Sequence, residues 1–295
     1  MESGVDPVFL TPRFLPRAWG RAHLGGWCAQ AARPAAAIGE VWSAHPNNVD
    51  IDGAHFGETL KQRPREMLGD LGRAPPTLRL VFAGEGADAL SGAGRVGLWR
   101  VLESKLGARV EASDGHGLRR PACRAGDLFR ASAHTRLRFD AGVSALEVAA
   151  AFAPANRVET TAPITRVDPA DETRPRVVWF RDPALSVEVW RLPPVSRLEP
   201  DGETCHLLMA LTPGASLDGA PLDPGQAVFV PAYGRTLTLT GAGAKVLVAY
   251  PDLVPTMIWT TTPPPDPAAD ALSRELAMTR DARIDAVAKL RGRAA

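Results

Sequence analysis

RAGDLFRASAHTRLRFDAG, residues 124–142, carries the pattern that decides the fold class. In its second part Leu137 and Phe139 alternate with three charged residues. An apolar side chain at every second position is typical of a β-strand that buries one face and wets the other. The order of a Gly-containing turn and a strand returns in PGQAVFVPAYG, residues 224–234. This repetition predicts two related β-sandwich halves of jelly-roll type.

Short apolar runs separated by Gly and Pro fill most of the chain, which is typical of strands joined by turns. A polar segment, TRVDPADETRPR at residues 165–176, divides these runs into two groups. We therefore expect an all-β fold with a first half over residues 76–165 and a second half over residues 176–255.

The two ends of the chain have other patterns. Residues 1–75 are irregular except for one expected helix in GETLKQRPREMLGDLG, which Pro64 should distort or restart. Near the C-terminus, Asp266 and Pro267 form a helix start, and apolar residues follow at helical spacing. This predicts a C-terminal helix over residues 264–295 that packs on its own protein. The alternative is a contact with a second subunit in a homo-oligomer.

Composition and charge exclude several classes of protein. Hydrophobic residues make up 45% of the 295 residues, which is enough for a core, and the formal net charge is +1. Such a near-neutral charge does not indicate a protein that binds nucleic acid or an anionic membrane through an excess of basic residues. The scattered Cys28, Cys123 and Cys205 indicate reduced thiols rather than a disulfide framework or a zinc ribbon. Without a signal peptide or a long apolar run, we expect a soluble, cytoplasmic protein.

Four stretches of the chain follow one another in an order that is known from one family. They are RAWGRAHLGGW (residues 17–27), IGEVWSAHP (38–46), GRVGLWRVLESKLGA (94–108) and RAGDLFRASAHTRLRFDAGVSALEV (124–148). They resemble motifs of the type I phosphomannose isomerases, which are metal-dependent cupins. The resemblance implies a double-stranded β-helix, the cupin fold, for both halves. It also implies that residues 1–75 pack on the cupin.

The resemblance fails at the positions that bind metal in that family. The family's Gln and His fall in a segment that is missing here, its Glu aligns with Gly97, and its last His aligns with Leu137. A zinc site needs about four N, O or S donors, and Gly and Leu supply none. We therefore expect neither zinc nor another cofactor. His134 and His116 remain the alternative donors of a rebuilt metal site.

The resemblance also points to residues that bind a ligand. Arg157 aligns with an active-site arginine of the family, and Arg100 replaces a family tyrosine. We expect Arg157 first, and Arg100 second, to bind a small anionic ligand, because a guanidinium holds phosphate or carboxylate through paired hydrogen bonds. The expected pocket is lined by small or apolar residues: Gly97, Leu137, Ala149 and Ala150.

Two further residues match the family without an assigned role in chemistry. His45 is expected to be a turn residue. Glu147 is open to two interpretations, as part of the site or as a structural hydrogen-bond partner within a strand.

These observations lead to one hypothesis and two alternatives. The hypothesis is a metal-free relative of the isomerases that has lost their reaction and binds a small anionic or sugar-like ligand, or acts in a specialised pathway. The first alternative is an active enzyme, either a mannose-6-phosphate isomerase or a catalyst of another metal-independent reaction in a remodelled pocket. The second is an assembly or scaffold protein that uses its C-terminal helix. No base and nucleophile pair stands at a convincing spacing, so whether the chain is an enzyme stays open.

Overall fold

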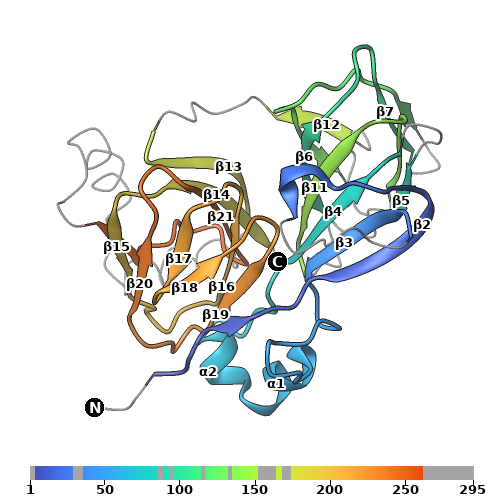
Figure 1. The fold of residues 1–295 in the computed structure, drawn as a ribbon. Helices are drawn as coiled ribbons and strands as arrows, with labels where there is room; N and C mark the ends of the chain where they lie inside the picture. The colour runs from blue at the N-terminus through green and yellow to red at the C-terminus, as the bar shows by residue number, and fades with distance from the viewer. Residues whose placement is uncertain are drawn as a thin grey trace.

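The chain folds into two β-rich halves that lie side by side (Figure 1). The computed structural model describes residues 4–28, 36–84, 89–92, 96–113, 117–131, 135–151, 164–167 and 174–261. The all-β fold expected from the sequence is confirmed within these residues. The expected C-terminal helix over residues 264–295 lies outside them.

The first half consists of a seven-stranded and a four-stranded sheet. Every pair of neighbouring strands in both sheets is antiparallel. The large sheet has the order β12 (Ile164–Val167), β9 (Leu128–Ala131), β6 (Gly97–Glu103), β11 (Ser144–Ala149), β4 (Thr77–Phe82), β3 (Ile38–Ala44) and β2 (Arg13–Arg21). The small sheet has the order β5 (Ala89–Gly92), β10 (Arg136–Phe139), β7 (Val110–Ser113) and β8 (Leu118–Arg119).

The second half repeats this plan with a six-stranded and a five-stranded sheet. Its large sheet has the order β1 (Val8–Phe9), β19 (Ala227–Val230), β16 (His206–Ala210), β21 (Lys245–Tyr250), β14 (Leu185–Arg191) and β13 (Arg176–Asp182). Its small sheet has the order β18 (Ala220–Leu222), β17 (Ala215–Leu217), β20 (Leu237–Thr240), β15 (Val195–Leu198) and β22 (Trp259–Thr261). The last strand therefore carries this half beyond residue 255, where the sequence placed its end.

Apolar side chains form three cores, and strand alternation assigns each side chain to one of them. On β6, Trp99 and Val101 point into the interior of the first half, whereas Leu98 and Leu102 point toward the second half. A separate cluster that includes Trp190 fills the interior of the second half. The central strands of the large sheets are thus buried on both faces. This explains why runs such as SALEVA lack an alternating polar face.

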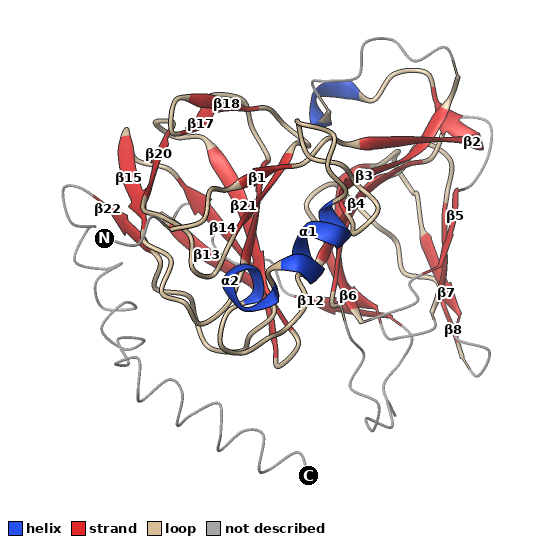
Figure 2. Cartoon of the chain, turned by 90° about the horizontal axis from the view of Figure 1, so that it is seen from below, coloured by secondary structure: helices blue, strands red, loops and turns tan. Residues whose placement is uncertain are grey.

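The N-terminal segment contributes strands to the sheets of both halves. Strands β2 and β3 extend the large sheet of the first half, and β1 pairs with β19 of the second half. The segment also forms a short 3-10 helix (Gly25–Trp27) and two helices, α1 (Phe56–Gln62) and α2 (Pro64–Leu68), at the junction of the halves (Figure 2). Pro64 begins α2, which confirms that it restarts the helix. No described helix is long and apolar enough to cross a bilayer.

Candidate functional site

Three of the four residues expected to line the pocket face the interior of the first half. Gly97 begins β6 and lies between Ala131 on β9 and Ala149 on β11. Its neighbour Leu98 belongs to the core between the halves, so alternation turns Gly97 and Ala149 inward. Leu137 on β10 is 1% exposed and packs in the interior core. The structure therefore brings Gly97, Leu137 and Ala149 to one interior.

These interior positions do not fit a zinc ion. Gly97, Ala149 and Leu137 carry no N, O or S donor in their side chains, whereas zinc requires such ligands. The backbone is also close here, because a Cβ atom on Gly97 would lie 3.0 Å from the carbonyl oxygen of Val148. Within the described residues, no three His, Cys, Asp or Glu side chains cluster in a way that could hold a metal. The expected absence of zinc stays a prediction, which elemental analysis can test.

Charged side chains do enter this interior, but they pair with one another. On β11, Glu147 lies opposite Arg79 of β4 and Trp99 of β6. Arg79 Nε donates a hydrogen bond to Glu147 Oε2 at 2.7 Å, and Arg79 Nη1 lies 3.7 Å from Glu40 Oε2. All three charged residues are buried. Glu147 therefore has the structural role that was one of its two interpretations.

Neighbouring residues hold this buried ion-pair cluster in place. The guanidinium carbon of Arg79 lies 5.0 Å from the ring centre of Trp42 and 5.6 Å from that of Trp99. Glu40 also accepts hydrogen bonds from Arg17 Nε at 3.2 Å and from Trp42 Nε1 at 3.3 Å. The carboxylates are thus engaged by cations and indole groups of the protein itself.

Arg100 and Ala150 lie elsewhere than the expected pocket wall. Arg100 faces away from Gly97, across the junction of the halves, and its guanidinium carbon lies 4.1 Å from the ring centre of Trp179. Ala150 is buried in the core between the halves. The physical reason is alternation, because even-numbered residues of β6 and β11 point toward the second half.

The remaining residues singled out from the sequence fall into two groups. Arg157, His134 and His116 lie outside the described residues. His45 is in a turn as expected, because its Nδ1 accepts a hydrogen bond from the backbone N–H of Asn47 at 3.1 Å.

A second buried ion pair, which the sequence did not reveal, occupies the interior of the second half. Glu188 on β14 accepts hydrogen bonds from Arg176 Nε at 2.6 Å, the Tyr250 hydroxyl at 2.7 Å and Trp190 Nε1 at 2.9 Å. Burial alone would raise the pKa of Glu188, but Arg176 and these hydrogen bonds hold that pKa below its usual value. Glu188 and Trp190 are two positions apart in SVEVWRL, so they point to the same face of the strand. A glutamate on the same face as a tryptophan was the signal for a buried carboxylate.

His206 lies beside this second ion pair. Its Nε2 is 2.7 Å from the hydroxyl oxygen of Thr256, whose backbone N–H bonds the Tyr250 hydroxyl. Burial lowers the pKa of His206 to about 4, so the imidazole is neutral near pH 7. In both halves a buried arginine and a buried glutamate thus bind each other.

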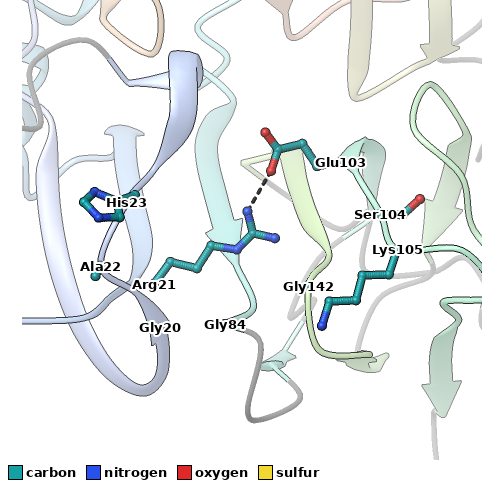
Figure 3. Close-up of a pocket in the computed structure, with 9 residues that line it drawn as sticks. All are labelled: Gly20, Arg21, Ala22, His23, Gly84, Glu103, Ser104, Lys105 and Gly142. Atoms are coloured by element: carbon teal, nitrogen blue, oxygen red, sulfur yellow. Dashed lines mark hydrogen bonds and ion pairs between the residues drawn. The ribbon is translucent and has the colours of Figure 1, made fainter.

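An open cleft of about 550 Å³ lies at the end of β6 opposite Gly97 (Figure 3). We call it the Arg21 cleft, and it is lined by Gly20, Arg21, Ala22, His23, Gly84, Glu103, Ser104, Lys105 and Gly142. Arg21 Nη1 donates a hydrogen bond to Glu103 Oε2 at 2.7 Å. Four separate stretches of chain contribute to the cleft, so no local motif could have revealed it.

Glu103 is held inside the wall of the Arg21 cleft by three donors. Besides Arg21, Trp27 Nε1 donates to Glu103 Oε1 at 3.1 Å, and the Ser144 hydroxyl donates to Glu103 Oε2 at 3.3 Å. Partial burial would raise the pKa of Glu103, but the hydrogen bonds from Arg21 and Trp27 hold that pKa below its usual value. Glu103 is therefore ionised near pH 7 and fixes the position of Arg21.

Two halves, each with a buried core between a large and a small antiparallel sheet, define a double cupin. The structure is similar to the mannose 6-phosphate isomerase of Bacillus subtilis, with a TM-score of 0.62, 18% identity and coverage of 83% of this chain and 99% of that one. It is also similar to a putative mannosephosphate isomerase of Archaeoglobus fulgidus, with a TM-score of 0.59, 16% identity and coverage of 85% of this chain and 100% of that one. The apo form of the mannose 6-phosphate isomerase of Salmonella typhimurium has a TM-score of 0.61 and 11% identity, with coverage of 84% of this chain and 100% of that one. No protein-family model and no curated protein matches the sequence.

At these identities the likeness establishes the fold. Two of these neighbours are mannose 6-phosphate isomerases and the third is a putative one, and this chain shares their architecture over nearly their whole length. Because one fold hosts many chemistries, the function has to be argued from the residues.

Proposed function

We propose that the protein is a metal-free relative of the mannose 6-phosphate isomerases that has lost their reaction and binds a small anionic or sugar-like ligand. The observation that carries this proposal is the interior of the first half. Gly97 and Leu137 stand there at the positions that align with two metal ligands of the family, and Leu137 is packed in an apolar core. Neither side chain can bind a metal.

The loss of these ligands removes a central contribution to the chemistry. An aldose–ketose isomerase has to stabilise the negative charge that develops on the substrate oxygen, and a metal ion does this as a Lewis acid. The described charges of this interior, Arg79, Glu147 and Glu40, already bind one another. An ion pair that is closed in this way is not free to polarise a substrate carbonyl.

Ligand binding is supported by the cations that line the Arg21 cleft. Arg157 remains a second proposed contact, because its alignment with an active-site arginine comes from the sequence alone. Arg100 is the weaker candidate, since it packs on Trp179.

A direct assay tests the loss of the isomerase reaction. The full chain is incubated with mannose 6-phosphate, with and without added zinc, and formation of the ketose phosphate is measured. A zinc-dependent mannose 6-phosphate isomerase serves as the positive control. We expect no turnover above the protein-free rate under either condition. Turnover that zinc restores would overturn the proposal.

A further inference from the structure

Two clefts on the described surface contain arginines and differ in how these cations are partnered. The first lies beside α2, and each of its arginines is already paired with a carboxylate. Arg235 pairs with Asp6 and Asp218, Arg63 with Glu66, and Arg65 with Asp70. These pairs neutralise the cleft beside α2, so it offers little attraction to an anion.

The Arg21 cleft holds one arginine in a fixed position with a nitrogen left over. Arg21 Nε donates to the carbonyl oxygen of Ala83 at 2.7 Å, and Nη1 donates to Glu103 at 2.7 Å. The side chain is only 19% exposed. Among the described residues Arg21 Nη2 has no hydrogen-bond partner, and Figure 3 shows the guanidinium directed into the cleft. A guanidinium held in this way loses little further entropy when it binds an anion.

Lys105 supplies the second cation from the opposite wall. Its aliphatic stem lies against Gly142, where a Cβ atom would come within 2.5 Å of Lys105 Cε. Glycine at position 142 therefore makes room for the lysine stem. The ammonium group extends into the cleft from the side opposite Arg21 (Figure 3). Within the part of the chain that the structure describes, Lys105 has no ion-pair partner.

The charges of the Arg21 cleft do not cancel. Two cations, Arg21 and Lys105, face one carboxylate, Glu103, whose oxygens are occupied by Arg21, Trp27 and Ser144. The lining also contains Ser104 and the exposed His23. The volume of about 550 Å³ lies within the range of small-molecule sites.

We propose that the Arg21 cleft binds a small phosphorylated molecule, with the phosphate between Arg21 Nη2 and Lys105 Nζ. Phosphate has enough acceptor oxygens to take hydrogen bonds from both cations at once. The inference rests on the proposed function, because it names the place and the chemical class of the ligand. The cleft lies at the far end of β6 from Gly97. The site therefore differs from the interior in which the resemblance places the family's metal.

Titration calorimetry of the full chain at constant ionic strength tests the inference, with inorganic phosphate, mannose 6-phosphate and uncharged mannose as probes. We expect both phosphates to bind and mannose not to bind. Lys105→Gln should raise the Kd for phosphate about tenfold or more, because a hydrogen bond to a charged group is lost. Lys105→Arg should stay within about threefold of the parent, because the charge is retained.

Lys61→Gln is the matched control, since Lys61 is an exposed lysine on α1 that pairs with Glu58. It should leave the Kd unchanged. Absence of phosphate binding by the parent would overturn the inference, and so would an equal Kd for Lys105→Gln and the parent. The latter result would place the ligand elsewhere and leave the proposed function standing. Zinc-dependent isomerase activity, in contrast, would overturn the proposed function and not the phosphate site.

Discussion

Burial decides what the charged residues of the first half can do. Arg79, Glu147 and Glu40 are each at most 6% exposed. Removing an ion from water is expensive, and only a close counter-ion offsets that cost inside a protein. The cluster therefore stabilises the fold as long as it is complete, and a member without its partner destabilises it.

Single replacements in this cluster should be more harmful than a paired replacement. Arg79→Met and Glu147→Leu should each lower the free energy of unfolding by about 3–5 kcal/mol, because each leaves a buried charge without its main partner. The double variant should lose less than the sum of the two singles. Urea denaturation of the four proteins measures this coupling.

The exposed pair Lys61–Glu58 serves as the control for these variants of the buried cluster. Lys61→Met should change the free energy of unfolding by less than about 1 kcal/mol, because the pair is exposed to water. Additive effects of Arg79→Met and Glu147→Leu would contradict the interpretation of the cluster as a buried, mutually dependent ion pair.

At the same scale, the sequence predicted side-chain orientation only where one face of a strand is polar. The alternation in TRLRFD predicted that Leu137 and Phe139 are buried, and both are. In LWRVLE of β6 both faces are covered, so the pattern did not reveal that Arg100 points away from Gly97. The bond between Arg79 and Glu147 joins residues 68 positions apart, which no local pattern could predict.

At the scale of elements, the N-terminal segment ties the two halves together. Val8 and Phe9 of β1 pair with β19 in the second half, and β2 pairs with β3 in the first. Between them Leu10 is fully buried in the core between the halves, and its backbone N–H donates to Ala227. Strand pairing and apolar packing thus act together at this point.

Leu10→Ala should therefore lower the free energy of unfolding by about 2–5 kcal/mol, because it leaves a cavity in a packed core. Leu106→Ala removes the same atoms from a fully exposed turn and should change stability by less than about 0.5 kcal/mol. Urea denaturation of the two variants makes the comparison. Equal losses would contradict the assignment of the N-terminal segment to the shared core.

The sequence predicted elements that depend on local signals better than elements that depend on pairing with distant strands. Pro64 restarts a helix because proline lacks an N–H and clashes with the preceding turn, which is a local effect. The addition of β2 and β3 to the large sheet of the first half depends on contacts with β4, which lies far along the chain. The sequence therefore predicted the break between α1 and α2 but not the place of the N-terminal strands.

At the scale of the whole molecule, the architecture makes weaker demands on particular residues than a metal site does. The chain keeps the double cupin of its solved neighbours at 10–18% identity. Core positions need only apolar side chains of suitable volume, whereas a metal site needs particular donors at fixed positions. An interior without metal ligands can therefore still hold two sheets together, and in this chain Leu137 and Trp99 pack in such a core.

Zinc content tests the central claim most directly. The full chain is equilibrated with excess zinc, dialysed into metal-free buffer and measured by elemental analysis beside a zinc-dependent mannose 6-phosphate isomerase. The account predicts zinc far below stoichiometric amounts, because Gly97 and Leu137 offer no ligand atoms. Stoichiometric zinc that is lost in His134→Ala or His116→Ala would contradict it.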